Sequence, residues 1–376
     1  MADKQTKQAK GTGQERAIFR LIAPGVVTAR DEWVYGRERA TLEEKAKFLV
    51  REVDKLGNSE LPEELTIKAS SGLKINLKRS LQFKYDDQSI VRAAYRPFEI
   101  AYYYFDPLLS DRLTDRHFEM LGEELTNANK IICFDREGDF SLSTQYIPDF
   151  HFTGDSQCLP LYRYSGGERI HNITDFALKA FRDQYADPGI SREDIFHYVY
   201  AVLHHPAYRE KYALNLRQEF PRVPFYPDFG RWVAWGRELM GLHVDFETVA
   251  PYPLERVEVP PKGDTPEARA LAARARLKVV RDAAKVPTGA IELDGLTTLR
   301  GVPPEAWRYR LGNRSALEWV LERHKEATPR DPTIRERFHT YRLADHKERV
   351  VDLLARVTTV SVETVRILGE MPPETV

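Results

Sequence analysis

Leu73–Phe105 reads LKINLKRSLQFKYDDQSIVRAAYRPFEIAYYYF and combines spaced cations with a dense aromatic run. From its first residue the stretch alternates in the way typical of strands, and Pro97 disfavours a helix around it. Cations neutralise phosphates, while aromatic side chains between them supply stacking or core area. The stretch therefore predicts strands with one basic face. That face is either a surface for a polyanion or the solvated side of a packed sheet.

The bulk composition describes a globular chain of two or three compact units. The 376 residues are 42% hydrophobic and 30% charged, and no apolar run approaches the length that spans a bilayer. The net charge of −1 excludes a generally basic coat protein but permits one local basic face. The first ten residues are polar and resemble no secretory signal, and the chain has only two cysteines. We therefore expect a cytoplasmic protein without disulfides.

Three patterns stand out in the first half of the chain. Glu15–Tyr35 predicts a strand, a turn and a second strand. Thr41–Leu56 has apolar residues at helical spacing and predicts a helix, with Thr41 as its N-cap and Glu44 as its capping-box partner. Ala128–Phe152 predicts two strands around a Glu-Gly-Asp turn. This half is expected to be rich in β-structure.

Helical periods dominate after Gly167. The propensity of the alanine- and arginine-rich run Ala268–Lys285 also favours helix, and either Asn313 or Ser315 is expected to cap a helix that continues through Trp319. The other expected helices are Thr174–Tyr185, one capped by Ser191, one opened by Pro206, Phe229–Leu242 and Asp345–Leu368. The prediction is an α+β fold in four parts: a flexible tail (1–14), a β-rich part (15–165), a helical cluster (166–250) and a mixed C-terminal part (251–376) that packs back on the first.

Two motifs suggest chemistry, and neither is well supported. Gly154-Asp155-Ser156, with His197 downstream, is similar to the nucleophile block of a GDS-type esterase, but His197 falls within a predicted helix. His204 and His205 lack a third ligand at metal-binding spacing. Phosphate-loop, dinucleotide-binding and amino-methyltransferase motifs are also absent from the sequence. We therefore predict a binding protein with no cofactor, no metal and no catalytic residue, and keep the esterase as an alternative.

Seven blocks of sequence, read together, resemble the C-terminal specificity region of type ISP restriction-modification enzymes. Arg269–Lys285 departs from the family pattern. The resemblance runs from about Ile18 to about Pro372, and the blocks that carry it are Gly25–Tyr35, Arg79–Phe105, Ser141–Tyr162, Ile173–Phe181, Glu193–Phe225, Leu299–Glu322 and Val360–Val365.

The resemblance implies sequence-specific recognition of double-stranded DNA by this chain. It also implies an adenine methyltransferase and a helicase-nuclease as partner domains or subunits, because their motifs are missing here. Such a protein places donors and acceptors against base edges while cations contact phosphates. The alternative within the family is a coupling module that does not bind DNA. The candidate DNA-binding residues are Lys78, Arg79, Gln82, Lys84, Arg92 and Arg96, with Arg30 and Arg314 as outlying phosphate contacts.

Overall fold

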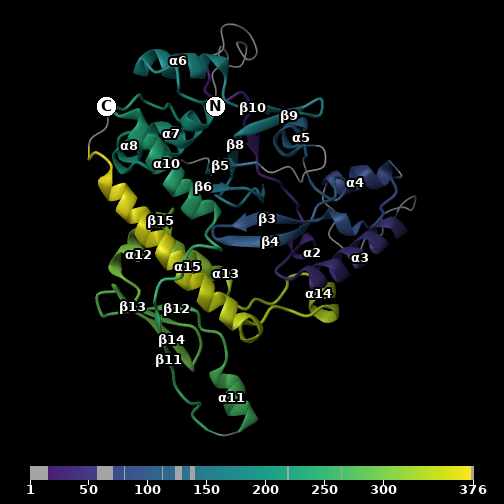
Figure 1. Ribbon diagram of the computed structural model, residues 1–376. Helices are drawn as coiled ribbons and strands as arrows, with labels where there is room; N and C mark the ends of the chain where they lie inside the picture. The colour runs from purple at the N-terminus through teal and green to yellow at the C-terminus, as the bar shows by residue number, and fades with distance from the viewer. Residues whose placement is uncertain are drawn as a thin grey trace.

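The computed structural model describes residues 16–56, 71–79, 81–111, 113–122, 129–135, 140–217, 220–263 and 265–373, without the side chains of residues 71, 72 and 78. The predicted tail lies outside the described residues. Helices alternate with several small sheets, so the predicted α+β class is confirmed. Figure 1 shows an elongated arrangement with α6 at one end and α11 at the other.

The aromatic stretch forms an antiparallel hairpin, as predicted for its second half. β3 (Ile90–Arg96) pairs with β4 (Glu99–Tyr104), and the tight turn between them places Phe98 at a positive φ of 56°. β2 (Tyr35–Gly36) and β7 (Ile147–Pro148) complete a sheet of order β2-β4-β3-β7, with β7 parallel to β3.

The first part of the same stretch is helical, so the strand prediction is wrong there. Leu73 and Leu77 lie four residues apart and are both buried on one face of α4 (Ser71–Lys78). Asn76 on this helix donates a hydrogen bond of 2.8 Å from Nδ2 to the carbonyl of Leu108. Residues 81–86 form no regular element, and the 3-10 turn η1 (Asp87–Ser89) follows them. Packing of two leucines at helical spacing outweighed the apparent alternation.

The helix predicted over Thr41–Leu56 exists, but its cap differs from the prediction. α3 (Arg39–Lys55) begins after Glu38, and the Thr41 hydroxyl donates to the Glu38 carboxylate instead of capping the backbone. The strand expected just before it is replaced by the single turn α2 (Asp31–Val34) followed by the two-residue β2. The Nζ of buried Lys45 on α3 donates to two backbone carbonyls beside α2, and these bonds hold the short turn against the longer helix.

A second sheet confirms the predicted pairing within 128–152. Residues 136–139, which include the expected turn, lie outside the described residues. Cys133 lies opposite Cys158 with their sulfurs 3.7 Å apart, and both thiols are free and buried. The strand order is β1 (Ala23–Pro24), β8 (Gln157–Pro160), β5 (Ile131–Phe134) and β6 (Ser141–Thr144). Nearby lie α5 (Asp115–Leu121) and the hairpin of β9 (Tyr162–Ser165) and β10 (Glu168–His171).

The helical cluster follows the sequence prediction closely. Ser191 caps α7 through a full capping box, and Thr174 caps α6. The helix expected after Pro206 divides at Tyr212 into two short pieces. Almost all of α7 is buried, because α6, α8 and α10 pack around it. The helices are α6 (Asp175–Tyr185), α7 (Arg192–His204), α8 (Pro206–Lys211), α9 (Ala213–Leu216) and α10 (Phe229–Val244).

The C-terminal part contains a small antiparallel sheet with one short helix beside it (Figure 1). The helix predicted over residues 268–285 is only half right, since its second part is a strand. Val279 and Val280 are β-branched and pair with the neighbouring strand, and this pairing outweighs the helical propensity of the run. The elements are β11 (Glu255–Glu258), α11 (Pro266–Ala272), β12 (Lys278–Arg281), β13 (Pro287–Glu292) and β14 (Thr297–Arg300), in the sheet order β11-β14-β13-β12.

The last helix, α15, packs against both the helical cluster and the helices of the C-terminal part. Ser315 caps α13 with a capping box, as predicted, and α15 extends slightly beyond the predicted bounds at both ends. Figure 1 shows α15 running along α10 at one end and past α12 and α13 at the other. The remaining elements are α12 (Pro304–Arg308), β15 (Arg310–Leu311), β16 (Arg314–Ser315), α13 (Ala316–Arg323), α14 (Pro332–Arg337) and α15 (Leu343–Glu370).

Two hydrophobic clusters hold these elements together. One contains Tyr103 of β4 together with Leu317 of α13 and Val357 of α15, so the N-terminal sheet and the C-terminal helices share a core. The other contains Phe196 and Trp232 of the helical cluster. Among the described residues, no helix has the length and apolar character needed to cross a bilayer.

Candidate nucleic-acid interface

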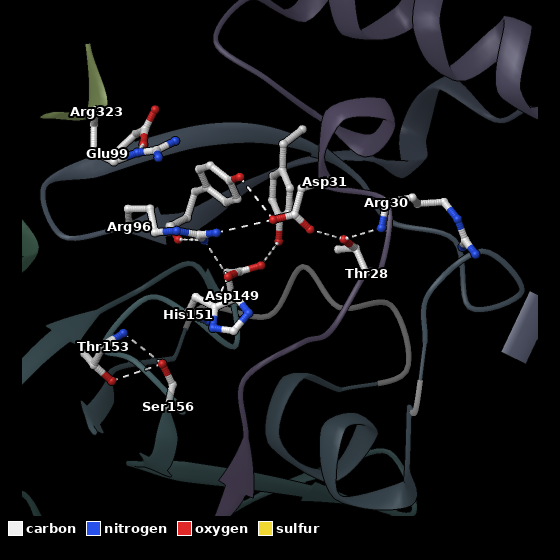
Figure 2. A network of polar contacts seen from close by, with 12 residues as sticks. Thr28, Arg30, Asp31, Arg96, Glu99, Asp149, His151, Thr153, Ser156 and Arg323 are labelled. Carbon is white, nitrogen blue, oxygen red and sulfur yellow. Dashed lines mark hydrogen bonds and ion pairs between the residues drawn. The ribbon is translucent and has the colours of Figure 1, made fainter. Parts of the chain in front are cut away.

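Arg96, at the end of β3, lies between two carboxylates. Its Nη1 donates to Asp149 Oδ1 at 2.6 Å, and its Nη2 lies 3.3 Å from Asp31 Oδ2. Asp31 also accepts from the Tyr95 hydroxyl, and Asp149 accepts from the Tyr35 hydroxyl at 3.0 Å (Figure 2). The Arg96 side chain is only 14% exposed. This arginine therefore fastens the hairpin to α2 and to the loop after β7.

Two other predicted arginines are also engaged within the protein. Arg30 is 5% exposed, and Figure 2 shows its side chain directed away from the Arg96 network. Burial lowers the pKa of Arg30, and the nearby Asp111 counteracts this effect. Arg92 pairs with Glu247 at 2.8 Å, and its guanidinium lies 5.5 Å from the centre of the Tyr102 ring. Both positions link elements that are far apart in the sequence.

The segment between α4 and η1 is different, because it carries exposed polar side chains. Arg79, Gln82 and Lys84 are exposed, while Phe83 between them is buried and donates its backbone N–H to Asp54. None of the three forms an ion pair or side-chain hydrogen bond with another described residue. We call Arg79, Gln82 and Lys84 the exposed triplet. Buried Phe83 fixes the backbone between Gln82 and Lys84, and the three side chains of the triplet are exposed.

The remaining two predicted residues lie apart from this group or outside the described atoms. The side chain of Lys78 is not among those described, although its backbone ends α4. Arg314 lies on β16 in the C-terminal part, with its guanidinium 5.1 Å from the centre of the Trp319 ring. The structure thus brings Arg79, Gln82 and Lys84 together on one segment, and it places Arg314 on a separate element.

Sequence reasoning missed one buried charge cluster beside the hairpin. The carboxylate of Glu99, 6% exposed, forms ion pairs with Arg37 Nη2 and Arg323 Nε, each at 2.7 Å. The two ion pairs join β4 to the N-terminal loop and to the end of α13. The positions of Arg37 and Arg323 are so far apart in the chain that no local pattern signals their meeting.

The electrostatics of Asp149 follow from its burial. Burial raises the pKa of Asp149 to about 6, and the neighbouring Asp31 acts in the same direction while Arg96 opposes both. The folded protein therefore holds a proton on this carboxyl more tightly than the unfolded chain, whose aspartates titrate near ~3.9.

Stability is expected to fall as pH rises through the range set by Asp149. The stabilisation from the protonated carboxyl is complete below about pH 4 and is lost as pH rises through about 6. A shift of about two pKa units corresponds to about 3 kcal/mol. In urea unfolding between pH 4 and 7, the free energy of unfolding of the wild type minus that of Asp149→Asn should decrease by about this amount. A difference that does not change with pH would contradict the assignment.

The esterase alternative finds no support in the geometry. Ser156 is fully buried, and its hydroxyl accepts hydrogen bonds from the backbone N–H and hydroxyl of Thr153 (Figure 2). In the described chain, no hydrogen bond joins Ser156 to His197, whose Nδ1 is buried without a partner. The described residues also contain no cluster of histidine, cysteine and carboxylate groups suited to a metal ion.

A comparison with models of known protein families identifies the family of this chain. The model of the type ISP C-terminal specificity domain matches residues 17–353. The chain belongs to this family. The predicted resemblance is therefore confirmed. The matched residues include the hairpin, the exposed triplet and the helical cluster.

Solved structures agree with the family assignment. The specificity domain superposes on a chain of the DrdV–DNA complex, solved by cryo-electron microscopy, with a TM-score of 0.94 and 58% identity over 100% of its length. It shares the fold of LlaGI bound to a DNA substrate mimic (TM-score 0.75, 24% identity, 99% of its length) and of LlaBIII bound to DNA (0.80, 22%, 100%). It spans 38%, 29% and 25% of those chains, respectively. No curated protein matches the sequence.

Proposed function

We propose that this specificity domain recognises a target sequence in double-stranded DNA for a type ISP restriction-modification system. The observation that carries the proposal is its 58% identity, over its full length, to a chain seen in a DNA complex. Adenine methylation, translocation and cleavage would come from a methyltransferase and a helicase-nuclease elsewhere, because the domain spans only part of its relatives. The working compartment would be the cytoplasm, where such DNA is met.

Within the domain, we assign the DNA contact to the exposed triplet. Arg79 and Lys84 offer cations, and Gln82 offers a paired donor and acceptor of the kind that reads adenine in the major groove. Their backbone is held by buried Phe83 between them. Arg92 and Arg96 would act indirectly, by fixing the hairpin beside this segment through Glu247, Asp31 and Asp149. Arg314 remains an outlying candidate and Lys78 lies next to Arg79 in the chain, whereas Arg30, at 5% exposure, would support the surrounding structure and not touch a phosphate.

Selection from a random duplex library at two salt concentrations tests the proposed function. The purified chain should enrich one asymmetric motif, and binding should weaken steeply with salt because each phosphate contact contributes about 0.9 to the slope of log K against log salt. Recovery of unsorted DNA would overturn self-sufficient recognition by this chain. Absence of any DNA binding would favour the coupling module.

Replacing the exposed triplet by alanine should weaken binding to the selected motif by at least about tenfold, because the base-reading contact of Gln82 alone contributes about 1–3 kcal/mol and the two cations are lost with it. The control variant Lys179→Ala/Lys325→Ala removes the same number of positive charges from exposed sites on α6 and just beyond α13. It should bind like the wild type in a fluorescence-anisotropy titration. Equal affinities for the triplet variant and the control would remove Arg79, Gln82 and Lys84 from the contact.

A further inference from the structure

The part of the molecule farthest from α6 in Figure 1 is a short arm on the C-terminal sheet. We define the basic arm as residues 262–285, which contain α11 and β12. Its sequence has seven lysine and arginine residues and three acidic residues, whereas the whole chain has a net charge of −1. The exposed triplet does not account for this local excess of positive charge.

The arm is exposed yet held in place. None of the residues of α11 is buried, although Thr265 caps the helix by accepting from the N–H of Ala268. The helix end is fixed by a hydrogen bond of 2.8 Å from the Gly295 N–H to the Ala272 carbonyl. The following chain is fixed by bonds from Arg276 and Leu277 to the carbonyl of Leu293. The backbone therefore presents α11 in one orientation without burying its side chains.

Five of the seven cations of the arm fall into two groups, and the other two, Lys262 and Lys285, are exposed at its ends. Three of them have carboxylate partners on neighbouring elements: Arg276 and Lys278 both contact Glu292, and Arg281 contacts Glu318 at 2.6 Å. Arg269 and Arg274 are exposed, and neither forms an ion pair with another described residue. The first group fastens the arm to its sheet, and the second group leaves two guanidinium groups available.

We propose that the basic arm holds the phosphate backbone of duplex DNA outside the target sequence, with Arg269 and Arg274 as the contacts. This inference rests on the proposed function, because it assumes that the domain meets DNA. Guanidinium groups bind phosphates in two-pronged geometry and carry no sequence information there. The arm belongs to a different sheet from the hairpin and lies away from α4 in Figure 1, so its contact falls beyond the bases that the triplet reads.

A protein partner fits the arm less well than DNA. The centre of a protein interface is apolar and depleted of charge. The arm exposes one large apolar side chain, Leu271 at 70%, among its cations, and isolated apolar side chains are normal on surfaces. The excess of positive charge complements a polyanion, and duplex DNA carries one phosphate charge per ~1.7 Å.

Binding of two duplexes by two variants tests the arm. The short duplex contains only the motif selected above, and the long one adds about two helical turns of random sequence on each side. Wild-type chain should bind the long duplex about tenfold more tightly than the short one at moderate salt. Arg269→Ala/Arg274→Ala should lose that gain and lower the salt slope on the long duplex by about 1.8, since each lost phosphate contact contributes about 0.9.

The same variant should bind the short duplex like the wild type, with an unchanged sequence preference. Lys179→Ala/Lys325→Ala, which removes two charged side chains elsewhere, should keep the gain from the flanks. Because Arg269 and Arg274 are exposed, circular dichroism of their variant should match the wild type.

The outcomes separate the arm from the proposed function. The chain could bind the short duplex specifically while Arg269→Ala/Arg274→Ala keeps the tighter binding of the long duplex. That result would overturn the phosphate contact of the arm and leave target recognition intact. Arm-dependent binding of long DNA without any preferred motif supports the arm and overturns self-sufficient recognition. A chain that binds neither duplex overturns both. If Arg269→Ala/Arg274→Ala loses the binding of a protein partner while its DNA binding is unaltered, the arm binds an acidic protein and not DNA.

Discussion

Replacing Gly236 by alanine is expected to destabilise the protein by about 4 kcal/mol, because a methyl group there has no space. Gly236 lies in the middle of α10, where this helix crosses α7. A Cβ at this position would lie 2.5 Å from the carbonyl carbon of His197 and closer still to its oxygen. Both obstructing atoms belong to a buried backbone, so the helices must separate. Chemical unfolding of the purified chain measures the loss.

Gly241→Ala is the matched control, because it changes the same helix five residues further along. An added Cβ there meets no atom within 4 Å. Alanine is a better helix former than glycine, so this variant should gain about 0.5–1 kcal/mol. Opposite signs for the two variants would establish close packing of α7 on α10. Similar stabilities for Gly236→Ala and Gly241→Ala would refute it.

Arg96→Met should lower the free energy of unfolding by about 3–5 kcal/mol near pH 7. Methionine retains most of the stem of the side chain but leaves Asp149, with 3% of its side chain exposed, without its cation. Uncompensated buried charge is costly, whereas protonation removes that charge. The loss should therefore be smaller at pH 5, below the pKa of about 6 of Asp149. Urea unfolding at both pH values measures the effect.

Arg92→Met provides the comparison for Arg96→Met. Arg92 and its partner Glu247 are 35% and 34% exposed, and ion pairs in such positions contribute about 1 kcal/mol or less. A loss from Arg96→Met no larger than the loss from Arg92→Met would show that the buried pair does not stabilise the hairpin. Arg96 would then return to the set of side chains available for DNA.

Local patterns in the sequence predicted the elements whose stability is local. The helices after Thr174 and Ser191 have their own caps and apolar faces, and α3 has its stripe, so their positions follow from nearby residues. The predictions of secondary structure fail where contacts with residues distant in the sequence determine the conformation. The run before Lys78 is a helix because Leu73 and Leu77 meet the core, and β12 is a strand because β13 lies beside it.

The candidate interface was predictable in part for the same reason. The exposed triplet could be predicted from the sequence, since Gln82 and Lys84 alternate with the apolar Leu81 and Phe83 just after Arg79. Exposure decides whether an arginine is free, and exposure depends on distant partners. Arg96 meets Asp149 and Arg92 meets Glu247, and neither carboxylate is near its arginine in the sequence. A basic stretch therefore contains both available and committed cations.

The contact between α2 and α14 has a consequence for synthesis on the ribosome. Trp33 donates from its indole nitrogen to Asp331 at 2.8 Å, across 298 residues, and Glu32 accepts from the backbone N–H of Asp331. At about 5–20 residues per second, the partner of Trp33 emerges roughly 15–60 s after Trp33 itself. During that time Trp33 and Glu32 lack the partner that Asp331 supplies. The contact between α2 and Asp331 can therefore form only after residue 331 has emerged, whereas the sheet β2-β4-β3-β7 needs only residues up to 148.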